Sequence, residues 1–230
     1  MAFDLNSEDA ALARIGDCPL FLRRARRGAP TPRRQALEAF IGARFAERHD
    51  ARIRHFMPDL LALEDVDGHL RAAVGVRDAA SGSLFLERYL DRPVEVELAL
   101  RHGVGVPRGR IAEVGNLAAL GVGHARLLIV ALTDLLVGEG FEWVVFTATT
   151  EVSNSFHRLA LAPLVLGKAD AARMGDERED WGRYYDGHPR VMAGAIRGGF
   201  ETLVTRGVFR QTNHRPLYAN GDGGCHAAVA

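Results

Sequence analysis

The 230-residue sequence has little of what assigns many proteins to a class at once. It contains two cysteines, Cys18 and Cys225, which are too few and too far apart for the disulfide framework of a small secreted domain. Lys168 is its one lysine, and acidic and basic residues balance to a net charge of zero. Because no overall field would attract nucleic acid, we expect a protein of a reducing compartment without a nucleic-acid partner.

Long apolar runs are also missing. A membrane-spanning helix needs about 20 apolar residues, and the most apolar stretch, 127–137, is interrupted by Thr133 and Asp134. Residues 1–17 are acidic and polar, without the positively charged start and apolar core of a secretory signal. The sequence therefore predicts a cytoplasmic protein with no transmembrane segment.

Common catalytic and metal-binding motifs do not occur. The nine histidines are scattered, and neither His-x-x-x-His nor Cys-x-x-Cys is found. A Gly-x-Ser-x-Gly elbow, a Walker loop and a paired-glycine dinucleotide fingerprint are missing as well. We therefore expect no metal site.

What the sequence does contain is enough apolar material for one substantial core, with 47% hydrophobic and 25% charged residues. We expect a loose N-terminal arm over residues 1–17 and a single domain over 18–210. A disordered tail is expected over 211–230, where Asn, Gly, His and Ala leave little to bury.

The first half of the domain shows helix and hairpin signals. Thr31, followed by proline, is a typical cap for a helix over 33–47. Asp-Gly at 67–68 separates two apolar runs, 59–65 and 69–77, which is a strong hairpin signal. This half therefore predicts antiparallel strands.

The second half is organised around residues 110–167. An apolar strand over 111–119, a glycine-bearing turn, a helix beginning near His124 and an apolar strand over 141–148 follow one another. A helix between two apolar strands implies a parallel crossover. The sequence thus predicts an α/β (α+β) fold with a mixed, twisted sheet of about six or seven strands, helices on both faces and a splayed parallel pair.

The glycine turn before this helix suggests a ligand. Such a turn leaves unpaired backbone amides at the positive end of the helix dipole, where a phosphate group can bind. His124 and Arg126 lie in the first turn of the helix, although exposed first-turn side chains need no ligand. Phosphate is therefore the first ligand that we expect.

Six motifs in a fixed order carry a resemblance to a known family. The thermostable hemolysin family of bacterial proteins is similar over about 110–200 in the motifs EVGNLA, GHARLL, WVVFTAT, SNSFHRLALAP, KAD and WGRYYDGHP. That family resembles a branch of the GNAT acyltransferase superfamily, close in style to acyl-homoserine-lactone synthases. The resemblance implies a GNAT-like fold and a phosphopantetheine thioester as donor, either acyl-CoA or an acyl-carrier protein.

The turn departs from the acetyltransferase pattern in one respect. That pattern begins with Gln or Arg, whereas the two possible alignments place Ala118 or Leu120 at this position. The glycines and small residues remain, with Arg126 nearby as a substitute cation. A carrier-bound acyl group, which presents a single phosphate, therefore competes with coenzyme A as the donor.

The resemblance implies that the donor lies along the strand over 111–119, the glycine turn, and the first residues of the two helices that begin near His124 and near Ser153. For Ser153 and Asn154, capping of a helix is an equal alternative, because Ser and Asn commonly begin helices. The implied donor-binding residues are Asn116, Leu117, Ala118, Gly121, Gly123, His124, Ala125, Arg126, Ser153, Asn154 and Phe156.

Glu113 is the candidate general base. An unpaired carboxylate in an apolar strand is costly, so it must be paired, solvated or held with a raised pKa. A base for an amine nucleophile needs such a raised pKa, and the alternative is a strand-end salt bridge to Arg108 or Arg110. Asn116 points to the opposite face in a regular strand, unless a bulge at Gly115 changes the alternation.

Tyr184 and Tyr185, next to Trp181, are candidate catalytic residues. A tyrosine hydroxyl could protonate the departing thiolate, and the rings could line an acyl pocket. The alternative is packing of this segment onto the edge of the sheet.

Three functions from different classes follow from these observations. The first is transfer of an acyl group from a thioester to an amine of a small acceptor. The second is a membrane-lytic protein, as the family name suggests, and the third is a ligand-binding module of the same fold that has lost catalysis. No feature of the sequence specifies an oligomeric state.

Overall fold

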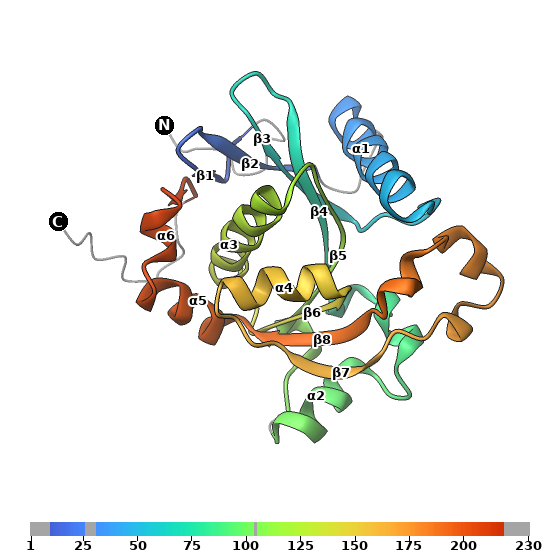
Figure 1. Cartoon of the computed structure of the whole chain (residues 1–230). Coiled ribbons are helices and arrows are strands. Elements are labelled where there is room, and N and C mark those ends of the chain that lie inside the picture. Colours follow the sequence, from blue (N-terminus) through green and yellow to red (C-terminus); the bar gives the residue numbers. More distant parts are fainter. Residues whose placement is uncertain (1–9, 26–30, 104, 219–230) are drawn as a thin grey trace.

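The computed structural model describes residues 10–25, 31–103 and 105–218. These residues build one nine-stranded sheet with the order β7-β8-β6-β5-β4-β3-β2-β1-β9 (Figure 1). Every neighbouring pair is antiparallel except β5 and β6. The strands are β1 (Ala13–Ile15), β2 (Leu20–Ala25), β3 (Asp59–Glu64), β4 (Leu70–Asp78), β5 (Ile111–Ala119), β6 (Trp143–Ala148), β7 (Leu164–Lys168), β8 (Arg190–Ala195) and β9 (Arg215–Pro216).

Helices connect and cover these strands. The α-helices are α1 (Pro32–His49), α2 (Val94–His102), α3 (Val122–Gly138), α4 (Thr150–Arg158), α5 (Ile196–Thr205) and α6 (Val208–Gln211). Short 3-10 helices are Ala79–Ser81, Phe85–Tyr89, Arg108–Arg110, Ala171–Trp181 and Tyr184–Gly187.

Local signals in the sequence account for several of these elements. The Thr31 hydroxyl accepts a hydrogen bond from the amide of Arg34 at 3.2 Å and caps α1, as predicted. The predicted hairpin at 67–68 joins β3 to β4, and β5 has the predicted bounds. Helix α3 begins at Val122, two residues before the predicted start, because the glycine turn supplies the first helical residues itself.

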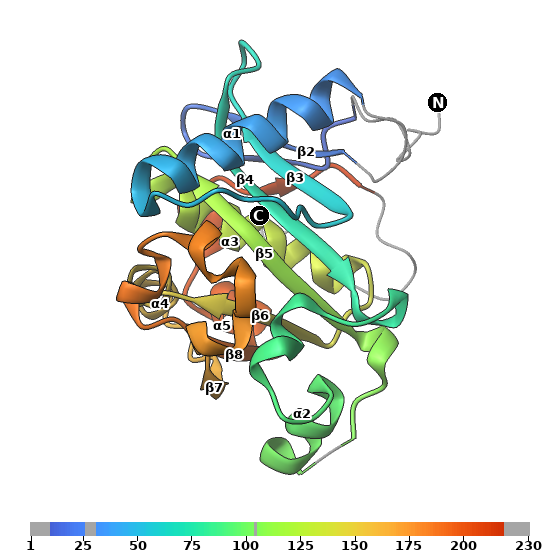
Figure 2. The ribbon, with the colours of Figure 1, turned by 90° about the vertical axis from the view of Figure 1, so that its right-hand side faces the viewer.

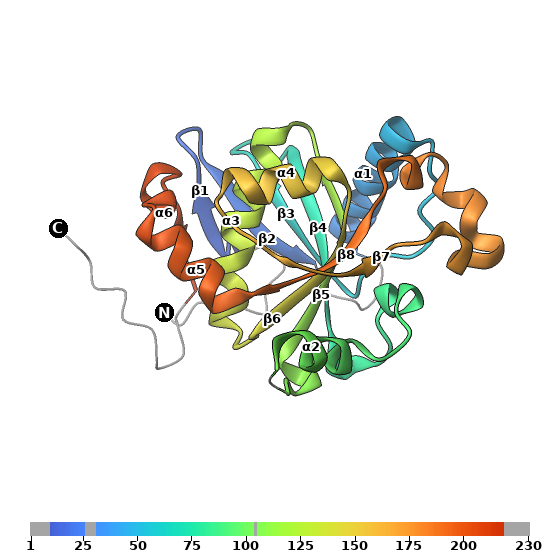
Figure 3. The same ribbon diagram turned by 60° about the horizontal axis from the view of Figure 1, so that its bottom comes forward.

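The two faces of the sheet are covered by different helices. Leu37 and Ile41 of α1 pack with Leu60, whereas Leu128 of α3 packs with the next residue, Leu61, which points to the opposite face. Helix α1 therefore covers one face and α3 the other (Figure 2). Helices α3 and α5 contact each other on the second face, next to α6 (Figure 3).

The sheet is larger than the six or seven strands predicted. The missed strand in the interior is β8, which lies between β6 and β7 and pairs antiparallel with both. It is short and ends in the sequence Ala193-Gly194-Ala195, which carries no clear strand periodicity. The other two additions are the short strands β1, which lies next to β2, and β9, which forms the edge of the sheet beyond β1.

Residues on both sides of the expected domain, 18–210, also belong to the sheet. In the expected arm, Ala13 and Ile15 are fully buried in β1, and their strand pairs with Arg215 and Pro216 of the expected tail. Residues 1–9 and 219–230 of these two segments lie outside the described residues. Strands from the two expected flanking segments thus pair with each other.

Part of the expected tail is also bound by a buried polar cluster. One carboxylate oxygen of Asp134 in α3 lies 2.8 Å from Nε2 of His214 and 2.8 Å from the hydroxyl of Tyr218. Asp134 is 4% exposed, so these two partners satisfy a charge that would otherwise be costly inside an apolar helix face. The cluster fixes residues after α6 against the last turns of α3.

The helices of the described residues are too short or too polar to cross a bilayer. None of them has both the length and the hydropathy required to cross a membrane.

Candidate functional site

The site begins where the parallel pair β5 and β6 separates. The two strands pair from Ile111 with Trp143 to Val114 with Phe146, and no further. Beyond this point β5 continues along β4 and β6 continues along β8, so each strand keeps its outer neighbour. The predicted splaying is confirmed, and it leaves an opening in the middle of the sheet.

A bulge in β5 creates the divergence. The register between β4 and β5 shifts after Gly115, and Asn116 has a left-handed φ of 53°. The bulge returns Asn116 to the α1 face, where its Oδ1 accepts from the amide of Met57 at 2.9 Å and its Nδ2 donates to the carbonyl of His55 at 3.3 Å. The Asn116 side chain thereby fixes the segment that follows α1.

Two glycines in β4 and β5 allow the segment around Met57 to approach the sheet closely. A Cβ at Gly75 would lie 2.4 Å from Cβ of Met57, and one at Gly115 would lie 2.6 Å from Cε of the same side chain. Real side chains do not approach this closely, so the two strands can hold Met57 against the bulge because both positions lack a side chain.

A cavity of about 520 Å³ occupies the opening and is lined from both faces of the sheet. On the α1 face its walls include Phe45, His49, Phe85, Tyr89, Trp181 and Tyr184. On the α3 face they are almost entirely apolar and include Leu128, Leu132, Leu136, Phe156, Leu161 and Ile196. The cavity therefore combines an aromatic chamber and an aliphatic chamber, with the end of the β5–β6 pairing between them.

Glu113 lies in the wall of the aromatic chamber. Its side chain is almost completely buried, and its two oxygens accept hydrogen bonds from the amides of Leu86 at 2.8 Å and Phe85 at 3.1 Å. Burial raises the pKa of Glu113, and the two amide hydrogen bonds offset part of this rise. The alternative, a salt bridge to Arg108 or Arg110, does not form, because Arg108 pairs with Glu87 and Glu95 and Arg110 pairs with Glu142. A buried carboxylate with a raised pKa has the property required of a general base.

The two candidate tyrosines have different surroundings. The ring of Tyr184 lines the cavity, and its hydroxyl has no hydrogen-bond partner among the described residues. The hydroxyl of Tyr185 lies 2.7 Å from that of Tyr89, and Tyr185 does not line the cavity. Burial raises the pKa of Tyr184, so its hydroxyl keeps its proton at neutral pH.

Two ring-bearing residues of α1 that line the cavity, Phe45 and His49, were not among the predicted site residues. Phe45 and His49 are four residues apart and hence on one face of the helix, and both pack against Tyr184, with ring centroids 6.4 and 5.3 Å away. Burial and the charges of Arg48 and Arg183 lower the pKa of His49. The spacing of Phe45 and His49 was visible in the sequence, but nothing there indicated that α1 ends beside the aromatic cluster.

The predicted phosphate turn lies at the edge of the cavity. Leu120, Gly121 and Ala125 line it, whereas Gly123, His124 and Arg126 do not. The amide of Ala125 donates to the carbonyl of Gly121 at 3.2 Å, so the unpaired amides of the first turn are those of residues 122–124. His124 instead lies beside Arg71, and burial together with this positive charge lowers the pKa of His124.

The remaining predicted donor residues lie on β5 and α4. Leu117 and Ala118 line the cavity, as does Phe156, whose ring stacks on Phe146 with centroids 4.8 Å apart. Helix α4 begins at Thr150, so Ser153 and Asn154 lie within it and are not its caps. Neither of these two lines the cavity; Ser155 and Val152 of the same helix do.

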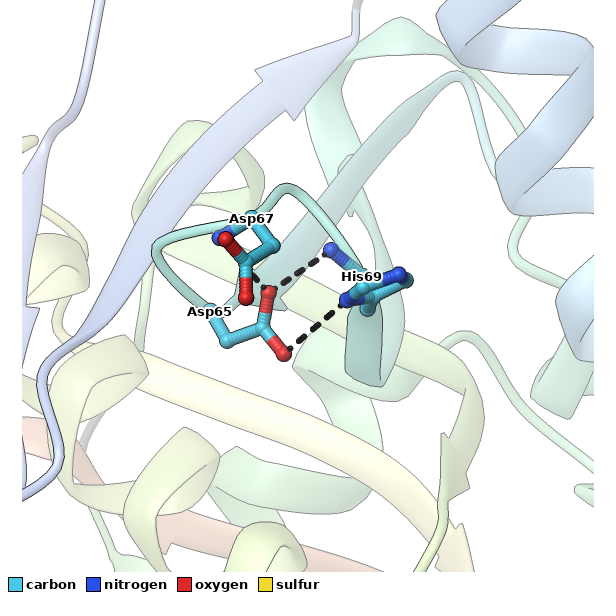
Figure 4. Close-up of side chains that lie close together, drawn as sticks. All are labelled: Asp65, Asp67 and His69. Atoms are coloured by element: carbon cyan, nitrogen blue, oxygen red, sulfur yellow. Dashed lines mark hydrogen bonds and ion pairs between the residues drawn. The ribbon is translucent and has the colours of Figure 1, made fainter.

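A separate polar cluster lies at the tip of the β3–β4 hairpin. Asp65, Asp67 and His69 bring potential ligand atoms within 4.8 Å of one another (Figure 4). One oxygen of Asp65 accepts from the amides of Asp67 and His69, and the other accepts from Arg71. These contacts account for the cluster as a hydrogen-bonded turn.

Three solved structures of similar architecture are described as synthases or as an acetyltransferase. FeeM, an N-acyl amino acid synthase from uncultured soil microbes, is 16% identical with a TM-score of 0.51, covering 80% of this chain and 97% of its own. The AHL synthase LasI is 14% identical with a TM-score of 0.51, covering 77% and 90%. A putative arylalkylamine N-acetyltransferase of the yellow fever mosquito is 9% identical with a TM-score of 0.52, covering 81% and 95%. At these identities the likeness establishes the GNAT-like fold.

Sequence comparison gives the family. No curated protein matches the chain. The profile described as thermostable hemolysin matches residues 28–200, which include α1, the strands β3 to β8 and all the residues that line the cavity. The chain belongs to the thermostable hemolysin family.

Proposed function

We propose that this protein transfers an acyl group from a phosphopantetheine thioester to the amine of a small acceptor. The observation that carries the proposal is the position of Glu113, a buried carboxylate with a raised pKa, in a cavity that passes through the opening between β5 and β6. A thioester arm in this opening would meet an amine from the aromatic chamber beside Glu113.

The donor would enter between the diverging strands. Its phosphate is proposed to bind at the first turn of α3, where the amides of residues 122–124 are unpaired and the helix dipole is positive. From there the arm would follow Leu117 and Ala118 toward the end of the β5–β6 pairing at Val114. Both coenzyme A and a carrier protein deliver such an arm.

The acyl chain is proposed to occupy the aliphatic chamber. This chamber is lined by Leu128, Leu132 and Leu136 of α3 and by Leu161 and Ile196, all of them apolar. A chain of several methylene groups would gain roughly 0.8 kcal/mol for each one buried, whereas an acetyl group would leave the chamber unfilled. We therefore expect a medium or long acyl group.

The reaction would proceed as follows. The acceptor arrives as an ammonium ion, loses one proton to Glu113 and attacks the thioester carbonyl carbon. A C–N bond forms, the C–S bond breaks, and the sulfur leaves as a thiol. Tyr184 is proposed to give its hydroxyl proton to the sulfur and to regain a proton from the nitrogen, which loses its second proton in this way. The products are an amide, a free thiol and one released proton held by Glu113 and then by water.

The test is an acyl-transfer assay on the purified chain. Donors from acetyl to dodecanoyl, on coenzyme A and on carrier protein, are combined with a panel of amines, and both thiol release and the mass of the amide are measured. Amide formation with medium or long donors supports the proposal. Donor binding without turnover of any amine would favour a ligand-binding module.

The family description supplies a second candidate, direct membrane lysis. The same preparation is therefore tested for dye release from liposomes in the absence of any thioester. Release that persists in a Glu113→Gln variant would contradict the enzyme proposal.

The donor turn makes its own prediction. Gly123→Val places bulk over the amides of the first turn, and since a Cβ at Gly123 meets nothing within 4 Å, the variant is expected to fold normally. We expect donor binding to weaken by about 2 to 3 kcal/mol, from the loss of two or three modest hydrogen bonds. Arg126→Ala, a change of a half-exposed charge, is expected to weaken binding by about 1 kcal/mol or less and in a salt-dependent way. Calorimetric titration with the donor measures both, and the reverse ranking would indicate binding by a side-chain cation.

A further inference from the structure

The arginines of the cavity differ in what neutralises them. Five of them line it, and three of the five have a carboxylate partner. The pairs are Arg44 with Glu47, Arg48 with Glu151 and Arg54 with Asp180. Arg52 and Arg77 have no carboxylate within ion-pair distance among the described residues.

Arg77 is placed directly opposite the candidate base. It lies on β4 as the cross-strand partner of Glu113 on β5, and both side chains point to the α1 face and line the cavity. Cross-strand partners have β-carbons about 5 Å apart. The two opposite charges are nevertheless not in contact as an ion pair, because both Glu113 oxygens face the amides of Phe85 and Leu86. Within the described part of the chain, Arg77 donates one hydrogen bond, to the carbonyl of Ser83 at 2.9 Å.

This juxtaposition matches one class of acceptor. An α-amino acid carries an ammonium group and a carboxylate on the same carbon, so a carboxylate and a guanidinium at adjacent positions on one face can bind both. We infer that the acceptor is an α-amino acid, with its amine at Glu113 and its carboxylate bound by Arg77; this inference rests on the proposed function. Arg77 is then the residue that selects a zwitterion over a simple amine.

The walls of the chamber specify the amino-acid side chain. Phe85, Tyr89, Trp181 and Tyr184 surround the space beside Glu113 and offer ring faces and edges. Such walls favour an aromatic or large apolar group over a charged one, because a charged group would be desolvated without a partner.

Arg77 could affect catalysis in a second way. Its hydrogen bond to Ser83 holds the turn just before Phe85, and the amides of Phe85 and Leu86 orient Glu113. A purely positioning role would change the reaction of every amine equally, whereas recognition of a carboxylate would change only the reaction of acceptors that carry one.

The experiment compares amino acids with the amines that lack only the carboxylate. Phenylalanine, tyrosine and leucine are paired with phenethylamine, tyramine and isopentylamine, and kcat/KM is measured for wild type, Arg77→Gln and Arg52→Gln with one donor. Arg52→Gln is the matched control, because it removes the same charge from the rim of the same cavity. We expect wild type to prefer the amino acids, and Arg77→Gln to lower their kcat/KM by about 10- to 100-fold, mainly through KM. The amines and the control should change by less than about threefold.

Each of the other outcomes decides about a specific part of the inference. An equal loss for amino acids and amines in Arg77→Gln, or a selective loss in Arg52→Gln, overturns the assignment to Arg77. If wild type acylates the amines as well as the amino acids, the acceptor is not recognised by its carboxylate. If no amine is acylated at all, the proposed function fails, and calorimetric titration with the three amino acids tests the site directly: binding that weakens in Arg77→Gln supports it, and no binding to wild type overturns it.

Discussion

Glu113→Gln is expected to lower kcat/KM for acyl transfer on the order of 100- to 10,000-fold, the usual contribution of a general base. Glutamine has nearly the same shape but cannot accept a proton from the amine. The effect should appear with every acceptor and donor, because each requires deprotonation of the nucleophile. His49→Gln is the comparison, since His49 lines the same cavity and burial lowers its pKa, which keeps the ring neutral and able to accept a proton.

The pH dependence gives a second measurement on the same variant. Burial raises the pKa of Glu113 above the ordinary value of 4.5, so wild-type kcat/KM should fall as the pH is lowered through that raised pKa. The slow residual reaction of Glu113→Gln should lack this limb. A limb that persists in Glu113→Gln and disappears in His49→Gln would transfer the role of base to His49.

Stability provides the control for folding. Because the pKa of Glu113 is raised in the folded chain, the unfolded chain loses its proton first, and the free energy of unfolding falls as the pH rises from about 4.5 through the raised value. Glutamine removes this penalty, but its NH2 group then faces the amide of Phe85 or Leu86. The two effects oppose each other, so we expect a melting temperature close to that of wild type.

Gly182→Ala is expected to destabilise the fold by about 3 to 5 kcal/mol. Gly182 follows the 3-10 helix Ala171–Trp181 with φ 48° and ψ −122°, a backbone conformation that glycine alone adopts without strain. A Cβ there would lie 2.3 Å from the carbonyl oxygen of His49 and 2.4 Å from that of Asp50. The neighbouring amide of Arg183 donates to the same His49 carbonyl at 2.7 Å, so the backbone of α1 cannot move away without losing this contact.

Gly175 supplies a matched control for this change. Its φ of 57° and ψ of −134° are almost those of Gly182, but a Cβ at Gly175 meets nothing within 4 Å. Gly175→Ala should therefore show the backbone strain alone, about 1 to 3 kcal/mol. Urea unfolding of both variants measures the difference, which isolates the overlap with α1. Equal losses would mean that the segment carrying Trp181 and Tyr184 is not held against the end of α1.

The sequence predicted those parts of the fold that local chemistry determines. Thr31 caps α1, Asp-Gly at 67–68 turns the hairpin, and continuous apolar residues define β5. Strand β8 was not predicted because its identity depends on its neighbours: six residues with a glycine become a strand between β6 and β7. Strand β1 likewise depends on its pairing with β2 and β9, and β9 depends on its pairing with β1.

The candidate site likewise contains residues that local sequence predicts and residues that only the fold brings together. Glu113 was recognisable because a carboxylate in an apolar strand needs an explanation. Its partners, the amides of Phe85 and Leu86, leave no trace in the sequence, since any residue supplies an amide. Arg77 was equally invisible, because its relation to Glu113 follows from the register of β4 with β5 across the bulge.

The short junction between β5 and β6 has a mechanical consequence. In the described residues, four paired positions are the only backbone pairing between the strands from β9 to β5 and the strands β6, β8 and β7. The sheet thus has two halves joined by this short pairing. A molecule bound in the opening would contact both halves and restrict their movement relative to each other. Bound ligand should therefore slow hydrogen exchange across the amides of β6 and β8, including residues that never touch it.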